Sequence, residues 1–121
     1  GDAAAFLSAG GYHHHIGLNT WDSKGGSPAP RGHTGPYHTA FLYPDRRQLA
    51  DALRRVTEAG YPIEGSADHG VSEAVYLSDP DGNGVALYRD RPEDEWPRDQ
   101  EGNIQMSNAP LDLEKLLSEA P

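Results

Sequence analysis

Short runs of apolar, aromatic and β-branched residues, bounded by glycine, proline, aspartate and serine, occupy much of the chain. Runs of this length and spacing are typical of β-strands. The Gly10-Gly11 pair between the first two runs favours a tight hairpin turn. We expect strands at residues 3–8, 12–21, 37–43, 71–78 and 85–90, with a further short strand at 63–66.

Two segments have helical spacing instead. Asp45 is suited to cap the start of the first helix, and Gly60 is suited to end it. The apolar stripe of that helix consists of Leu49, Ala52, Leu53 and Val56. A shorter amphipathic helix is expected near the C-terminus, where it would cover part of the sheet. Its apolar positions are Leu111, Leu113, Leu116 and Leu117.

The composition changes abruptly at residues 22–35, which are rich in glycine, proline and serine and almost free of apolar side chains. Such a segment is typical of a linker. The order of elements therefore predicts an α+β fold in which a βαβββ module at residues 36–92 follows a terminal β-hairpin at residues 1–21. Residues 93–121 form a tail that ends in the short helix.

The charge balance narrows the possible partners. The 121 residues include 19 acidic and 10 basic side chains, for a formal net charge of −9, and no cysteine. A surface of this sign repels phosphate backbones, so we expect no nucleic-acid partner. Disulfides and thiolate metal sites are excluded. No apolar run is long enough to span a bilayer, so we expect a cytoplasmic protein without a membrane partner.

A run of histidines, His13, His14 and His15, lies inside the second expected strand. Strand alternation predicts that His13 and His15 point to one side of the strand and His14 to the other. His13 and His15, on the same face, would then suit an adventitious nickel or zinc site. A tag remnant is a weaker interpretation, because tags are longer and stand at a terminus.

Four segments, in order, resemble those of one known family. They are residues 12–21 (YHHHIGLNTW), 68–74 (DHGVSEA) and 79–84 (DPDGNG), followed by the closing pairs Arg91-Pro92 and Trp96-Pro97. Together they are similar to catechol-2,3-dioxygenase-like, single-domain members of the vicinal oxygen chelate superfamily, which comprises glyoxalases, bleomycin-resistance proteins and extradiol dioxygenases. The resemblance implies two βαβββ modules around a divalent metal. It also implies that this sequence begins partway through the first module, so that residues 1–21 are the closing hairpin of an N-terminally incomplete module.

The resemblance implies an Fe(II) site, or a site for another divalent metal, made of two histidines and one carboxylate. His38 matches one histidine ligand, and the other would come from a strand that precedes this sequence. The position of the glutamate ligand holds Ala86, whose methyl group cannot coordinate a cation. Glu73 is a poor substitute, because the family has this residue beside its usual glutamate. Asp90 lies about 13 Å beyond Ala86 along the expected strand, which is too far for it to replace the glutamate without a register shift.

Three further residues match the family's catalytic groups. The resemblance implies that His15 is an acid–base histidine, that Tyr76 hydrogen-bonds a bound catecholate, and that His69 is a second pocket histidine. Each also has a plain structural interpretation. His15 would be polar lining, Tyr76 an ordinary strand aromatic, and His69 a turn residue beside Gly70. His38 alone would be a hydrogen-bonded barrel histidine, since one imidazole binds metal weakly.

Three functions remain open at this stage. The first is an extradiol ring-cleaving dioxygenase, inactive if Ala86 prevents iron binding. The second is a module that binds small molecules without catalysis, as the antibiotic-sequestering members of the superfamily do. The third is an inactive fragment of the fold. In each of the first two cases the partner is a small aromatic or hydrophobic ligand, and an open sheet edge favours a homodimer.

Overall fold

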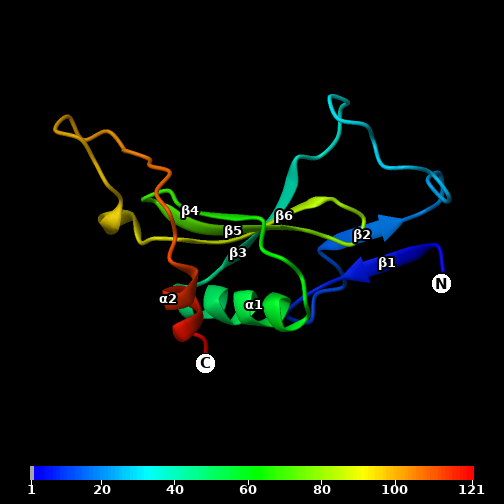
Figure 1. Ribbon diagram of the computed structural model, residues 1–121, viewed down its shortest axis with the longest axis horizontal. Coiled ribbons are helices and arrows are strands. Elements are labelled where there is room, and N and C mark those ends of the chain that lie inside the picture. Colours follow the sequence, from blue (N-terminus) through cyan, green and yellow to red (C-terminus); the bar gives the residue numbers. More distant parts are fainter. Residues whose placement is uncertain (1) are drawn as a thin grey trace. The chain divides into compact units, whose positions relative to one another are not determined.

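The computed structural model describes residues 2–121 and divides into two compact units, the first ending at His33 and the second spanning Thr34–Pro121 (Figure 1). The boundary between them lies within residues 22–35, where glycine and proline limit regular structure. Each unit is described by itself below. Within residues 2–121, every helix is too short or too polar to cross a membrane.

The first unit is an antiparallel hairpin of β1 (Ala4–Leu7) and β2 (Ile16–Asn19). The expected tight turn is wrong, because residues 8–15 form a longer connection between these strands. Gly10 and Gly11 both have positive φ angles there, 69° and 76°. The hydroxyl of Ser8 donates to the carbonyl of Tyr12 within the connection. This local hydrogen bond competes with strand pairing, and the second strand accordingly starts four residues later than expected.

The second unit contains the βαβββ module that the sequence predicts. Its order is β3 (His38–Tyr43), α1 (Arg46–Glu58), β4 (Gly65–Asp68), β5 (Ser72–Ser78) and β6 (Gly84–Asp90). The strands form one sheet in the order β3-β6-β5-β4, with β3 parallel to β6 and the other neighbours antiparallel. A 3-10 turn at Glu93–Glu95 and α2 (Leu113–Ser118) follow.

Local chemistry sets the ends of α1 as expected. The carboxylate of Asp45 accepts a hydrogen bond from the backbone N–H of Gln48 at 2.8 Å, which satisfies one of the helix's free donors. Gly60, with a φ of 86°, follows the helix. Figure 1 shows α1 and α2 on one side of the four-stranded sheet. The core lies between these helices and the sheet. Its fully or almost fully buried side chains include Leu49, Leu53, Val75, Leu87 and Leu116.

Strand alternation gives this sheet two different faces. On β5, Glu73, Val75 and Leu77 are buried on the helix side. Ser72, Ala74 and Tyr76 lie on the opposite face, where they line a cavity. The sheet therefore separates an apolar core from a face that carries polar and aromatic side chains.

A buried ion-pair cluster holds the helix side of the sheet to both helices. Glu73, only 1% exposed, is bound by the guanidinium groups of Arg46 and Arg89. Arg46 also binds Glu119, which caps α2, at 2.9 Å. Burial alone would raise the pKa of Glu73, but hydrogen bonds from Arg46 and Arg89 outweigh it and hold that pKa below its usual value.

Two five-residue turns share the same hydrogen-bonding pattern, in which an aspartate accepts from the backbone of later residues. In the first, Asp79 accepts hydrogen bonds from the backbone of Asp81 and Asn83. In the second, Asp99 accepts from Glu101 and Asn103 in the same way, at 2.8 and 2.9 Å. The sequence predicts the first turn, but residues 93–110 were expected only as a polar tail. The second turn, whose flanks pair through an Arg98–Ile104 bridge, is a structural finding.

Candidate functional site

A cavity of about 190 Å³ lies on the sheet face opposite to the helices. Its wall brings together three of the residues that the sequence singled out, His38, His69 and Tyr76. The full lining is His38, Ala40, His69, Ser72, Ala74, Tyr76, Ala86 and Tyr88. A space of this size is suited to a single aromatic ring, because cavities of about 150 Å³ hold benzene and drug-sized ligands need 300 Å³ or more.

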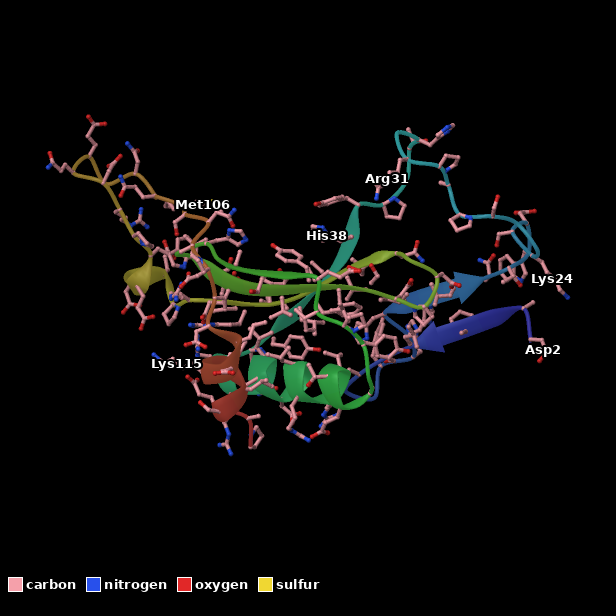
Figure 2. All side chains as sticks on the ribbon, in the orientation of Figure 1. Asp2, Lys24, Arg31, His38, Met106 and Lys115 are labelled. Carbon is pink, nitrogen blue, oxygen red and sulfur yellow. The ribbon has the colours of Figure 1, made fainter. Side chains whose placement is uncertain are left out.

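Strand register explains why this face is hollow. Ala86 of β6 lies beside Ala40 of β3 and opposite Tyr76 of β5. Ala74 lies opposite Tyr88 one step along the same pair of strands. Small side chains thus line neighbouring strands, while histidine and tyrosine side chains provide larger walls. Figure 2 shows His38 labelled on β3, and its ring centroid is 6.1 Å from that of Tyr76.

The first residue of β3, His38, lies at this cavity because the backbones of β3 and β6 approach closely there. His38 is paired with Gly84, and a Cβ atom at Gly84 would collide with the carbonyl oxygen of Tyr37. Only glycine leaves room for β3 to lie this close to β6. The turn residues before β6 therefore help to place His38 at the cavity.

Tyr76 and His69 are joined by a hydrogen bond, with 3.1 Å between the phenol oxygen and Nε2 of His69. The other ring nitrogen, Nδ1, lies 3.1 Å from the carbonyl oxygen of Ser107. Ser107 also donates its backbone N–H to the carbonyl of His69 at 3.0 Å. The imidazole is thus held between the strand and the C-terminal segment.

The residue before His69 anchors the same turn. Asp68 accepts hydrogen bonds from two Arg91 nitrogens at 2.6 and 2.8 Å and from the backbone N–H of Gly70 at 2.8 Å. The Arg91 guanidinium is the main reason why the pKa of Asp68 falls to about 2. The backbone of Asp68 pairs with Ala109 in both directions. His69 therefore sits on a turn that is held at both ends.

The residues at this cavity do not fit an iron triad. His38 supplies one imidazole, and the methyl group of Ala86, 3% exposed, stands where the resemblance implies a glutamate. Across residues 2–121, no three histidine, aspartate or glutamate side chains gather as metal ligands would. Glu73 is bound by arginines on the other face of the sheet, and Asp90 is exposed at the end of β6.

His15 belongs to the first unit and is exposed. Its Nδ1 lies 3.4 Å from the hydroxyl of Ser8, and its ring lies 4.9 Å from that of Tyr12. The expected alternation of His13 and His15 against His14 is wrong, because the strand begins only at Ile16. In the turn that precedes it, Nδ1 of His13 lies 2.8 Å from Nδ1 of His14 instead.

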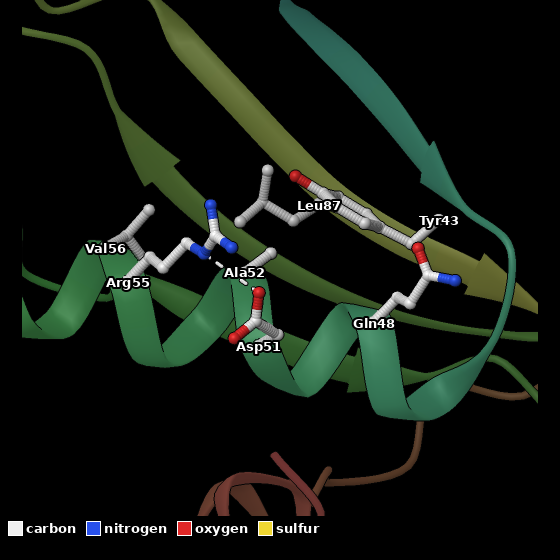
Figure 3. A pocket seen from close by; sticks show the side chains of 7 residues that line it. All are labelled: Tyr43, Gln48, Asp51, Ala52, Arg55, Val56 and Leu87. Carbon is white, nitrogen blue, oxygen red and sulfur yellow. Dashed lines mark ion pairs between the residues drawn. The ribbon is translucent and has the colours of Figure 1, made fainter. Parts of the chain in front are cut away.

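A larger cavity of about 370 Å³ lies between α1 and the sheet (Figure 3). Its lining is Tyr43, Gln48, Asp51, Ala52, Arg55, Val56 and Leu87. Asp51 and Arg55 form an ion pair with a distance of 2.8 Å, and burial raises the pKa of Tyr43. We favour the smaller cavity as the functional site despite its size, because it gathers His38, His69 and Tyr76.

Comparison with known proteins places this arrangement in a family. Residues 1–87 match the Glyoxalase/Bleomycin resistance protein/Dioxygenase superfamily. The chain belongs to this superfamily. The match agrees with the resemblance found in the sequence and with the βαβββ module of the second unit.

Two relatives in this superfamily are named dioxygenases. The chain is 56% identical over 90 residues to the catechol-2,3-dioxygenase of Bacillus subtilis (strain 168), a match that covers 74% of this chain and 31% of the relative. It is 35% identical over 89 residues to biphenyl-2,3-diol 1,2-dioxygenase 3 of Rhodococcus globerulus, covering 73% of this chain and 46% of the relative. The chain thus spans less than half the length of these relatives.

Two features of the site escaped the sequence reasoning. The contact of His69 with Ser107 joins positions 38 residues apart, and the segment around Ser107 has no periodic pattern. Asp68 and Arg91 were part of matching strings, but their pairing depends on the register of β4, β5 and β6. The one available signal was the opposite charge of these two residues.

Proposed function

We propose that this chain forms the part of an extradiol-dioxygenase-type site that contacts the aromatic diol. It binds a small catechol-like ligand without holding iron on its own residues. The observation that carries this proposal is Ala86, a buried alanine in the wall of the cavity at the glutamate position of the family. A methyl group has no lone pair to offer a cation.

The cavity has the chemistry for such a ligand. Tyr76 and Tyr88 provide aromatic surface, and His38 and His69 provide ring nitrogens that suit a hydroxylated ring. The size also agrees, because about 190 Å³ is enough for one aromatic ring. Similarity to enzymes that are named for catechol and biphenyl-2,3-diol supports the same ligand class.

The test restores the missing ligand. Ala86→Glu places a carboxylate in the cavity close to His38, and we expect this variant to retain more Fe(II) or Mn(II) after desalting than the wild type. The gain should disappear when His38→Ala is added to Ala86→Glu, because one carboxylate without the imidazole binds weakly. Metal content is measured by elemental analysis after anaerobic loading.

Ala74→Glu is the matched control. It also adds a carboxylate to the cavity, but from β5 and one step along the strands, opposite Tyr88 rather than Tyr76. We expect no gain of metal there. A wild-type chain that retains one Fe(II) per molecule would contradict the proposal, as would equal metal gains by both glutamate variants.

A second candidate function is ring cleavage itself, which the 56% identity to a catechol-2,3-dioxygenase favours. Under this hypothesis, Fe(II)-loaded protein in air converts catechol to a yellow ring-cleaved product. For this candidate the resemblance implies an acid–base role for His15 and a hydrogen bond between Tyr76 and the bound diol. Absence of product at stoichiometric iron, with catechol binding intact, would eliminate this candidate and leave the binding function.

A further inference from the structure

Ser107, His69 and Tyr76 are joined by two consecutive hydrogen bonds, here called the relay. When the imidazole of His69 is neutral, only one assignment of donors and acceptors satisfies both bonds. A backbone carbonyl can only accept, so the proton of the His69 ring must reside on Nδ1, 3.1 Å from the oxygen of Ser107. Nε2 is then an acceptor. Tyr76, whose phenol oxygen is 3.1 Å from Nε2, must donate its single proton to it.

This direction decides what the phenol offers to the cavity. A tyrosine hydroxyl has one proton and two lone pairs. Because the proton of Tyr76 points at His69, the oxygen presents only lone pairs to the rest of the cavity wall that it shares with His38 and Ala86. A ligand hydroxyl that keeps its proton can donate to these lone pairs. An ether oxygen has no proton to donate and would meet them as a repulsive contact.

The C-terminal segment holds this arrangement in place. The backbone N–H of Ser107 donates to the carbonyl of His69 at 3.0 Å, and the carbonyl of Ser107 faces Nδ1 of the His69 ring. Ser107 thus contacts both the backbone and the side chain of His69. Two further hydrogen bonds, of 2.8 and 3.0 Å, join Asp68 to Ala109. Ser107 is thus a positioning residue, which acts on the ligand only through His69 and Tyr76.

We propose that the carbonyl of Ser107, through His69, fixes Tyr76 as a hydrogen-bond acceptor toward the cavity, so that the site selects aromatic ligands that carry a hydroxyl proton at this position. The inference rests on the proposed function for its ligand class. Its two parts, the direction of the relay and the selection of a hydroxyl donor, are tested separately.

The direction of the relay is tested without any ligand. Long-range ¹⁵N–¹H NMR of the whole chain at pH 8, where imidazole side chains are ordinarily neutral, distinguishes the two tautomers of each histidine. We expect His69 to have its proton on Nδ1. The assignment uses the variant His69→Gln, in which the His69 signals are lost. A His69 ring with its proton on Nε2 would overturn the proposal, whatever the chain binds.

The selection is tested with catechol and its dimethyl ether, 1,2-dimethoxybenzene, by calorimetric titration of the metal-free chain. Tyr76→Phe removes the acceptor and should weaken catechol about five- to tenfold, the usual effect of one neutral hydrogen bond, while the ether loses a repulsive contact and should bind at least as tightly as to the wild type. Tyr61→Phe, which removes a phenol from an exposed residue after α1, is the control and should change neither. Equal weakening of both probes would show that Tyr76 donates, and would overturn the proposal.

His69→Phe gives an independent prediction, because it releases the phenol proton of Tyr76. The ether should then bind more tightly than to the wild type, so that the preference for catechol over ether shrinks. His69→Gln, whose amide oxygen can accept from Tyr76, should restore part of that preference. If the wild type binds neither probe, the proposed function and the selection both fail, and the tautomer of His69 still decides the direction of the relay.

Discussion

Asp68→Asn removes one negative charge from the turn that holds His69, while it keeps the size of the side chain. The asparagine can still accept hydrogen bonds from the backbone N–H of Gly70 and from one nitrogen of Arg91. Its amide NH₂ faces the other Arg91 nitrogen, which lies 2.8 Å from a carboxylate oxygen in the wild type. The substitution therefore tests the ionic part of this contact rather than its shape.

The magnitude follows from the pKa of Asp68. Its usual value is 3.8, and the Arg91 guanidinium lowers it to about 2 in the folded protein. At 1.36 kcal/mol per pKa unit, ionisation of Asp68 contributes about 2 kcal/mol to the free energy of unfolding at pH 7. The side chain is 27% exposed, so high salt should reduce this figure.

The sign of the pH dependence is set by the lowered pKa. Because the folded state releases its proton more readily than the unfolded state, the contribution is complete above about pH 5. It falls as the pH drops through 3.8, is about half its full size near pH 3, and vanishes below about pH 2. The difference between wild type and Asp68→Asn should follow this curve.

Urea unfolding followed by circular dichroism at pH 7, 5, 4 and 3 measures this difference. Asp94→Asn is the control, since it makes the same chemical change at an exposed carboxylate and should leave the free energy of unfolding at pH 7 nearly unchanged. A wild type and Asp68→Asn variant of equal stability at pH 7 would refute the reasoning. So would a difference of the same size at pH 7 and pH 3.

Two further predictions concern the rest of the second unit. Glu73→Gln should lower the free energy of unfolding by about 3–5 kcal/mol in calorimetry, because it deprives Arg46 and Arg89 of their buried carboxylate; a loss under about 1 kcal/mol would mean that the cluster behaves like a surface ion pair. We also expect a homodimer by light scattering, because β3 is an edge strand whose Phe41 and Leu42 are 37% and 57% exposed. Leu42→Lys should shift it toward monomer, and a wild type that stays monomeric at high concentration contradicts the prediction.

Much of the second unit could be predicted from local pattern. Asp45, the apolar stripe of α1 and Gly60 act within one helix, so their effect is visible in the order of residues. The turn at Asp79 is of the same kind. Prediction failed where a local hydrogen bond competed with strand pairing. Ser8 and the glycines of residues 8–15 form a longer connection than expected. His13, His14 and His15 therefore lie in that connection and not in the strand.

The site was predictable only in part. The resemblance singled out His38, His69 and Tyr76, and the structure places all three at one cavity. His15 lies in the first unit, and its acid–base role stays a prediction. Ala86 was recognised as the departure from the family pattern, and its burial in the cavity wall gives that departure a physical consequence.

By itself, the sequence determined the family, the βαβββ order and the loss of a carboxylate at Ala86, because each of these depends on which residues follow one another. Only the tertiary structure decided that Ser107 contacts His69, that His69 hydrogen-bonds Tyr76, and that Glu73 faces the helices. These contacts join residues far apart in the chain, and hydrogen-bond direction depends on which atoms meet in space. The ligand class that we propose for this site depends on the second set.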